Sequence, residues 1–279
     1  MTACAARRDH GPEHDVDAAA VAEFTAEYGV RLPPVTVVIA AYNEERGIGD
    51  VVDAIPHRVA GLDAATIVVV DGSADDTAAI ARKQGAHVCE VPVNRGQGAA
   101  LRLGYRIARA GGARYIVTTD ADGQYDAADI EKVLAPILAD QADFVTGSRI
   151  LGRQETYDKV RRLGVHVFAR LVSVLTGHRV TDTSFGLRAM RAALTEHVTL
   201  RQPQYQASEL LISVIMNGYR VREVPATMRL RTAGTTKKGG NLTYGYRYAK
   251  VVIGTWRRER RRARRDRAGL RGVRPHGRL

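Results

Sequence analysis

The chain has 279 residues, of which 45% are hydrophobic, and this length suits one large α/β domain with a sizeable core. Its two cysteines, Cys4 and Cys89, exclude a disulfide framework and a cysteine metal cluster, so we expect a reducing compartment. The net charge is +12, but residues 257–279 hold eleven arginines against two acidic residues, which leaves only +3 for the rest of the chain.

Composition also argues against an export signal, a membrane span and a nucleic-acid partner. The first thirty residues carry charges and no apolar segment, and the uncharged stretch 32–43 is shorter than the roughly 20 residues of a spanning helix. The body has no stripe of interleaved basic and aromatic residues, so nucleic-acid binding is not expected. We expect a cytoplasmic protein, either soluble or peripheral on the cytoplasmic face of a membrane.

Residues 1–33 are predicted to be a polar extension with a short helical piece, and residues 34–256 to be one domain. Within this domain, apolar runs alternate with helical segments, which predicts a mainly parallel sheet with right-handed crossovers, flanked by helices. The expected strands are 35–42, 66–71, 86–91, 114–120 and 143–149, and the expected helices are 45–55, 74–85, 97–110 and 126–139.

Polar clusters follow three of these strands at their carboxyl ends. They are residues 42–44, 71–73 and 120–124. Because ligands of such folds bind at the carboxyl ends of the strands, three clusters at one edge predict a binding site there.

The pattern changes after residue 150. Helices are expected at 159–178 and 208–218, a strand at 219–230 and an aromatic-rich amphipathic segment at 242–256. Residues 257–279 are predicted to be a disordered basic tail, which anionic lipid headgroups attract by about 1 kcal/mol per arginine. The helix at 159–178 is amphipathic and carries Lys159, Arg161, Arg162 and Arg170, with Leu163, Val167, Phe168, Leu171, Val174 and Leu175 on its apolar side.

The acidic pair Asp120 and Asp122 predicts a divalent metal site. Two like charges one residue apart repel each other unless a cation lies between them. Mg²⁺ and Mn²⁺ prefer oxygen ligands, and Gln124 adds an amide oxygen nearby. A metal ion here would bridge a diphosphate and neutralise its charge as it leaves. The alternative is a helix N-cap with a solvated carboxylate, since a helix is expected from residue 126.

Two further segments have both a binding and a structural interpretation. Asp71, Gly72 and Ser73 can hydrogen-bond a base or a ribose, or can form a plain turn with Ser73 or Asp75 as N-cap. The segment NRGQGAAL at 94–101 lacks the third glycine of a dinucleotide fingerprint and follows the third strand rather than the first. This argues against a nicotinamide-dependent dehydrogenase.

Seven segments stand in the order found in glycosyltransferase family 2: VIAAYNEE, VVVDGSADDT, NRGQGAAL, TTDADGQY, VTGSR, DTSFGLRAMR and REVPATMRLRTAGTTK. From about 35 to 256 the chain resembles this family, and most of all its dolichol-phosphate mannose synthase and polyprenyl-phosphate glycosyltransferase branch. The resemblance implies a GT-A fold, a nucleotide-diphosphate sugar donor, Mg²⁺ or Mn²⁺ as cofactor, and inversion at the anomeric carbon.

The resemblance also implies roles for single residues, which fall into groups for the nucleotide, the metal, the acceptor phosphate and the donor phosphates. These are Ala40, Tyr42, Glu44, Asp71 and Gly98 for the nucleotide, Asp120, Asp122 and Gln124 for the metal and diphosphate, Arg149 and Arg162 for an acceptor phosphate, and Arg231 and Lys237 for the donor phosphates. Guanidinium groups suit phosphate, and glycines at 234, 239 and 240 allow the last segment to fold over a ligand. The alternative for this segment is a flexible exposed loop.

The chain departs from the family pattern at two positions. It has only Asp71 before Gly72, where two acidic residues are common, and Gln97 stands where a lysine is frequent. The first departure puts the role of Asp71 as a reader of the base in question.

Three reactions remain open from the sequence. The first moves a hexose to a polyprenyl phosphate, which is already an anion and needs no strong base, so that Asp122 and Arg231 would act on the departing diphosphate. The second uses a hydroxyl of a soluble small molecule or glycan and needs a base, for which Asp182 and Glu209 are the candidates. The third is a sugar nucleotidyltransferase, for which AAYNEERG is a poor phosphate loop.

Overall fold

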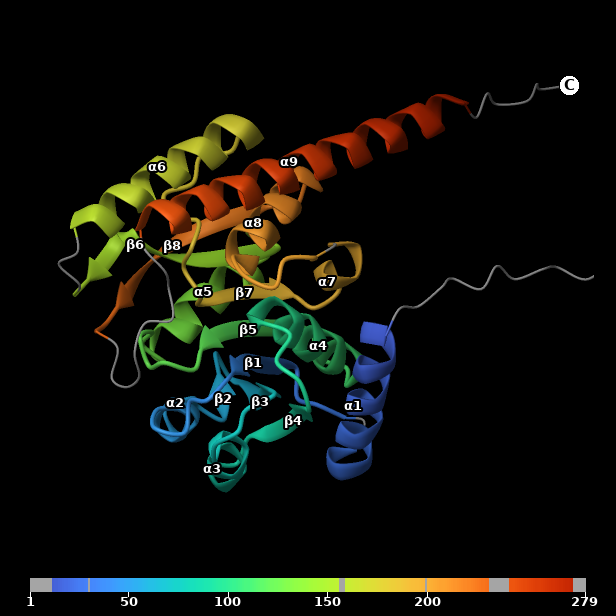
Figure 1. Ribbon diagram of the computed structural model, residues 1–279, viewed down its shortest axis with the longest axis vertical. Coiled ribbons are helices and arrows are strands. Elements are labelled where there is room, and N and C mark those ends of the chain that lie inside the picture. The colour runs from blue at the N-terminus through green and yellow to red at the C-terminus, as the bar shows by residue number, and fades with distance from the viewer. Residues whose placement is uncertain (1–11, 30, 156–158, 199, 231–240, 273–279) are drawn as a thin grey trace, which may run out of the picture.

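The computed structural model describes residues 12–29, 31–155, 159–198, 200–230 and 241–272. In this part of the chain, helices lie on both faces of one mixed sheet (Figure 1). The strands are β1 (Val35–Ala41), β2 (Arg58–Val59), β3 (Leu62–Asp71), β4 (His87–Val91), β5 (Tyr115–Asp120), β6 (Phe144–Gln154), β7 (Arg188–Arg191) and β8 (Val221–Met228). The helices are α1 (Pro12–Tyr28), α2 (Ile48–Asp53), α3 (Thr77–Lys83), α4 (Gln97–Ala110), α5 (Asp129–Leu138), α6 (Lys159–Thr176), α7 (Leu194–His197), α8 (Gln206–Met216) and α9 (Asn241–Gly272).

The sheet is mainly parallel, which confirms the predicted fold class. The strand order is β2-β3-β1-β5-β7-β6-β8, with β4 paired to the other side of β3. Strands β1, β3, β4 and β5 pair in parallel, and so do β6 and β8. Two short strands of the described sheet run antiparallel to their neighbours: β2 to β3, and β7 to both β5 and β6. The sequence pattern predicted neither of them.

The central strands are buried on both faces, as their continuous apolar runs predict. Along β1, Val38 packs into one core with α4, α8 and α9, while Val37 and Ile39 pack into the other with α2, α3 and α5. Their exposed fractions are zero. The sheet therefore holds the loops at its edge on a rigid base.

Helix α9 begins before residue 257, where the arginine-rich tail is predicted to start, and continues to Gly272. Figure 1 shows α9 as one helix that crosses over α8 beside α6 and then projects beyond the rest of the fold. Thr255 and Glu259 are 1% and 3% exposed, so the first part of the arginine-rich segment is anchored in the protein. Arg258 of this part is paired with Glu209 and Glu259, whereas Arg257, Arg261 and Arg265 are exposed.

Helix α6 packs only part of its apolar surface against the core. Phe168 stacks on Tyr248 of α9 with ring centroids 4.3 Å apart, and Leu171 and Leu175 are partly buried. Leu163, Val167 and Val174 of the same predicted apolar side are 64%, 55% and 71% exposed. Helix α1 of the predicted N-terminal extension also docks on the domain, with Phe24 buried against the core.

None of the helices in the described ranges has an apolar stretch that would be long enough to cross a membrane.

Candidate functional site

The carboxyl ends of β1, β3, β4 and β5 meet at one edge of the sheet. The register pairs Ala40 of β1 with Asp120 of β5, and Asp71 of β3 with Val91 of β4. The three polar clusters that follow β1, β3 and β5 are thereby brought to the same edge, as the sequence predicted. The roles assigned to their members remain predictions.

The loops after β1 and β3 are joined by hydrogen bonds. The Asn43 amide donates to Ser73 Oγ at 2.9 Å, and the Ala74 amide donates back to Asn43 Oδ1 at 3.0 Å. The Glu44 amide donates to Thr77 Oγ1 at 2.9 Å. Tyr42 is 37% exposed at this edge.

Asp71 points into the protein and holds the glycine-rich loop. Its Oδ2 accepts hydrogen bonds from the amides of Arg95 at 2.9 Å and Gly96 at 2.7 Å. The side chain is 3% exposed, and burial raises its pKa, while the two backbone N–H groups oppose the shift. The single acid before Gly72 thus positions the loop, and base recognition by Asp71 stays a prediction.

Arg95 connects this loop to helix α1, a contact that no local sequence pattern predicts. Its Nη1 lies 2.8 Å from Asp17 Oδ1 of α1, and its Nε lies 4.0 Å from Asp71 Oδ1. Both members of the first pair are largely buried, with side chains 12% and 23% exposed. Helix α1 therefore takes part in fixing the edge of the sheet.

We expect Asp17→Ala to destabilise the protein by about 1–3 kcal/mol, because it leaves the largely buried Arg95 without its nearest carboxylate. The matched control is Asp63→Ala, which breaks the Arg58–Asp63 pair whose side chains are 70% and 73% exposed and which should change little. Urea unfolding midpoints measure both variants. Equal effects would show that the buried pair adds nothing beyond surface charge.

The glycine-rich loop packs closely on Gln202 and Pro203. The Gly98 amide donates to Pro203 O at 2.9 Å, and a Cβ on Gly98 would lie 1.9 Å from Gln202 O. The structure accounts for this glycine by close packing, and its contact with the nucleotide remains a prediction.

Asp120 of the acidic pair lies beside Gly186, just before β7, and Tyr125, whose hydroxyl accepts a hydrogen bond from the Gly186 amide. Asp120 Oδ1 accepts a hydrogen bond from Gln97 Nε2 at 3.0 Å, and a Cβ on Gly186 would approach Asp120 Oδ2 to 2.6 Å. Asp122 is 7% exposed. Burial is the main cause of the raised pKa of Tyr125, and the charges of Asp120 and Asp122 raise it further. Both acids therefore lie near the Tyr125 phenol, which stays neutral.

Two carboxylates at this edge suit a hard divalent metal ion, and the Gln124 side chain suits it less well. Within the described residues, no group of three or more His, Cys, Asp and Glu side chains could hold a metal. Mg²⁺ typically uses one or two carboxylates and completes its shell with phosphate oxygens and water. The pair Asp120 and Asp122 fits that pattern. Gln124 contributes less directly, since its Nε2 donates to Arg229 O at 3.3 Å and its amide to Asp122 Oδ1 at 3.2 Å.

Arg188 is a buried cation near the acidic pair that the sequence analysis did not single out. It is 3% exposed on β7 and donates to the carbonyl of Phe185. Burial lowers its pKa, and the Tyr105, Tyr125 and Asp120 groups oppose that shift. Its only sequence signal is an arginine between apolar residues in FGLRAM.

Arg149 and Asp182, which were assigned different roles, bind each other. Arg149 Nε lies 2.6 Å from Asp182 Oδ2, and the guanidinium also donates to Ser184 Oγ at 3.0 Å. Asp182 is fully buried and its backbone amide donates to Glu223. A carboxylate enclosed in this way is poorly placed to take a proton from a soluble acceptor. Arg149 stacks over Phe185 at 5.7 Å, and Phe185 directly precedes Gly186.

The other candidates lie apart from this cluster or outside the described part. Arg162 is exposed on α6, while Glu209 is fully buried and accepts from the amides of Arg201 and Gln202, which leaves it unsuited to act as a base. Arg231 and Lys237 fall outside the described residues.

A family model and related proteins all identify the chain as a glycosyltransferase. The model described as Glycosyl transferase family 2 matches residues 36–199. A dolichyl-phosphate hexose transferase of Haloferax volcanii is 39% identical, with 78% of this chain and 93% of the relative covered. A UDP-N-acetylglucosamine–dolichyl-phosphate N-acetylglucosaminyltransferase of Methanococcus voltae is 32% identical, with 76% and 91% covered.

Solved structures agree on the fold. Glucosyl-3-phosphoglycerate synthase of Mycobacterium tuberculosis, crystallised with Mn²⁺, UDP and phosphoglyceric acid, superposes with a TM-score of 0.64. The two chains are 21% identical, with 90% of this chain and 84% of that chain covered. At this identity the likeness shows the fold alone, and it confirms the expected GT-A architecture.

Proposed function

Because the chain belongs to glycosyltransferase family 2, and is therefore a glycosyltransferase, we propose that it moves a hexose from a nucleotide-diphosphate sugar to a polyprenyl phosphate. Two relatives that are named for transfer to dolichyl phosphate support this acceptor class. The family assignment also argues against a sugar nucleotidyltransferase.

The observation that carries the lipid acceptor is the exposed apolar line on α6. Val160, Leu163, Val167 and Val174 are 55% to 71% exposed and follow one another at helical spacing along one side of the helix. Exposure of such an apolar face to water is unfavourable. Each residue stabilises membrane binding by about 1 kcal/mol when its side chain enters the apolar part of the bilayer. An acceptor that is free in solution gives no reason for it.

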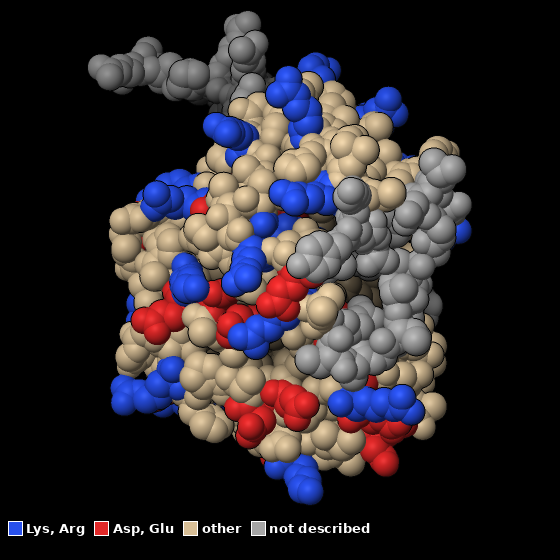
Figure 2. All heavy atoms as spheres, turned by 90° about the vertical axis from the view of Figure 1, so that its left-hand side faces the viewer, with Lys and Arg blue, Asp and Glu red and all other residues tan. Residues whose placement is uncertain are grey.

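Charge around this helix supports the same interpretation. Arg162 and Arg170 are exposed on α6. Figure 2 shows Lys and Arg interspersed with uncharged surface on the upper part of one face, at the level of α6 and α9, and most Asp and Glu lower down. Apolar and cationic side chains together suit an anionic membrane surface. We therefore propose peripheral association with the cytoplasmic face of a membrane.

At the sheet edge, Asp120 and Asp122, with Gln124 beside them, would hold Mg²⁺ or Mn²⁺. When bound, the ion would offset charge on the departing diphosphate. Relatives of the same fold crystallised with Mn²⁺ or Mg²⁺ and UDP support the choice of ions and a nucleotide donor. Gln97 orients Asp120, and the Asp71–Gly96 contact fixes the loop that faces it. Ala40, Tyr42 and Glu44 would line the nucleotide side.

On the acceptor side, Arg149 would bind the phosphate of the lipid. Its guanidinium is oriented by Asp182 and Phe185, and planar guanidinium groups match phosphate geometry. The acceptor oxygen is already anionic, so that positioning, rather than proton removal, would be the task of these residues. Arg162 would lie further out, with Arg231 and Lys237 on the donor phosphates.

The test is transfer of radiolabelled sugar from a nucleotide-sugar panel to polyprenyl phosphate in vesicles, followed by organic extraction. We expect the label in the lipid phase, and we expect Leu163→Ser/Val167→Ser to lower vesicle binding by about tenfold or more. The matched control Leu163→Ile/Val167→Ile keeps the apolar surface and should bind as the wild type does.

Label that enters only a water-soluble product would point to a hydroxyl acceptor and contradict the proposal. Unchanged vesicle binding by the serine pair would remove the argument from α6.

A further inference from the structure

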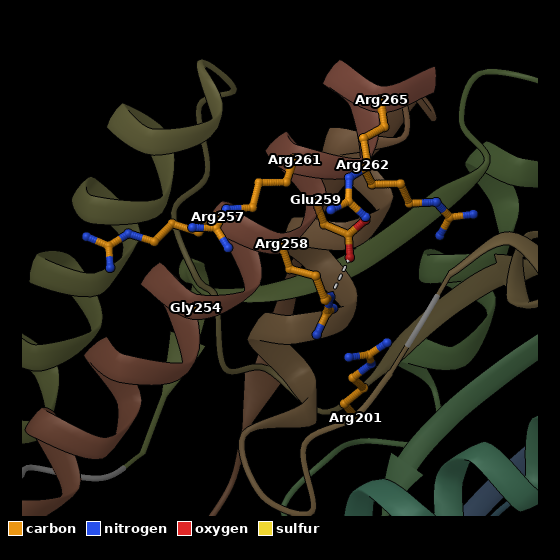
Figure 3. Close-up of a pocket in the computed structure, with 8 residues that line it drawn as sticks. All are labelled: Arg201, Gly254, Arg257, Arg258, Glu259, Arg261, Arg262 and Arg265. Carbon is orange, nitrogen blue, oxygen red and sulfur yellow. Dashed lines mark hydrogen bonds and ion pairs between the residues drawn. The ribbon is translucent and has the colours of Figure 1, made fainter. Parts of the chain in front are cut away.

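Helix α9 and the segment before α8 form an arginine-lined pocket that shares no lining residue with the sheet edge. The pocket has a volume of about 630 Å³. Six arginines line it, and Glu259 is the one acidic residue among the described residues of the lining. The arginines are Arg201, Arg257, Arg258, Arg261, Arg262 and Arg265 (Figure 3).

One arginine fixes the floor of this pocket. Arg258 Nη1 lies 2.7 Å from Glu209 Oε1, and its Nε lies 2.9 Å from Glu259 Oε1. These two carboxylates have side chains 0% and 2% exposed, and Ser213 donates to Glu259 at 3.3 Å. Figure 3 shows Arg258 between Glu259 and Arg201. The pocket is therefore built on a buried ionic cluster and does not depend on chance side-chain positions.

The remaining charge at the pocket is not balanced by protein. In the part of the chain that the structure describes, no carboxylate forms an ion pair with the side chains of Arg201, Arg257, Arg261 or Arg265. Arg257, Arg261 and Arg265 are spaced four residues apart on one side of α9, where like charges destabilise a helix. A bound anion would remove this repulsion.

We propose that this pocket binds a phosphate-bearing anion. Guanidinium groups form charge-assisted, bidentate hydrogen bonds with phosphate oxygens, and several of them in a recess favour a ligand with more than one negative charge. The site is separate from the donor site and does not require the proposed reaction. It assigns part of the attraction for anions expected of the arginine-rich tail to six named arginines.

A diphosphate in solution and the headgroup of an anionic phospholipid share this chemistry, and two binding experiments distinguish them. The first titrates inorganic pyrophosphate into the full chain by calorimetry, without divalent ions and at low salt, where charge pairing is least screened. The second measures sedimentation with vesicles of phosphatidylcholine alone or with added phosphatidylglycerol.

The test variant is Arg257→Gln/Arg261→Gln, and the matched control is Arg31→Gln/Arg264→Gln, which loses the same charge from exposed positions outside the pocket. Glutamine keeps the helix propensity of arginine, and circular dichroism checks that each variant folds. We expect the pocket variant to bind pyrophosphate about tenfold or more weakly, or to lose the phosphatidylglycerol-dependent part of vesicle binding, while the control keeps both.

Loss of pyrophosphate binding in the pocket variant identifies a soluble phosphate ligand, and loss of vesicle binding alone identifies a lipid headgroup. Either result supports the site. Equal binding by the pocket and control variants in both experiments, or no binding by the wild type in either, would overturn it. Asp122→Asn should leave these results unchanged, which separates them from the donor site.

Discussion

Asp122→Asn is expected to lower the rate of sugar transfer by about 100-fold or more, the largest loss of any single substitution at the sheet edge. The substitution removes one of the two carboxylates that share the locality of Tyr125, and it leaves the size of the side chain unchanged. An amide in its place cannot offset the charge of a divalent ion. The same change should weaken Mn²⁺-dependent binding of a nucleoside diphosphate in calorimetry.

Asp126→Asn is the matched control for charge in the same loop. Asp126 accepts hydrogen bonds from the Ala128 amide and from Arg229, and it faces these groups instead of the acidic pair. We expect it to retain most of the transfer activity. Similar losses in the two variants would mean that general charge in the loop, and not a ligand role for Asp122, explains the effect.

Arg149→Met is expected to cost about 3–5 kcal/mol of folding free energy, because it leaves the fully buried Asp182 without its cation. The double variant Arg149→Met/Asp182→Asn should recover part of this loss, and a double-mutant cycle measured by urea unfolding gives the coupling between the two side chains. Additive losses would show that the contact at 2.6 Å contributes little.

Arg149→Lys separates the stabilising role of this arginine from its proposed role toward the acceptor. Lysine keeps the charge beside Asp182 but lacks the planar fork that binds phosphate at two points. We expect near-normal donor KM and a raised KM for the polyprenyl phosphate. A rise in the donor KM instead would place Arg149 on the donor side.

Local sequence patterns predicted the parallel half of the fold well. The expected helix 97–110 coincides with α4, and the expected strand 35–42 matches β1 to within one residue, because a long helical pattern and a continuous apolar run leave few alternatives. Strand β7 was missed since four residues carry too little pattern, and its place between β5 and β6 is decided by pairing with distant strands.

The ion pairs of the site could not be predicted for a related reason. Arg149 and Asp182 stand 33 residues apart, and Arg258 and Glu209 stand 49 apart, so no local spacing reveals them. Composition also could not reveal that Arg258 of the arginine-rich segment contacts Glu209 and Ser213 of another helix. The residue types and their spacing were enough to name candidate metal ligands. Only the tertiary structure shows which charged side chains already form ion pairs within the protein.

The contact of the glycine-rich loop with residues 201–203 limits how this enzyme can be recombined. Gly98 gives its amide to Pro203, and it has no room for a methyl group beside Gln202. Segments 94–101 and 201–203 therefore depend on each other for packing, although about a hundred positions separate them in the chain. A chimaera that exchanges the glycine-rich loop of this scaffold must exchange both segments together.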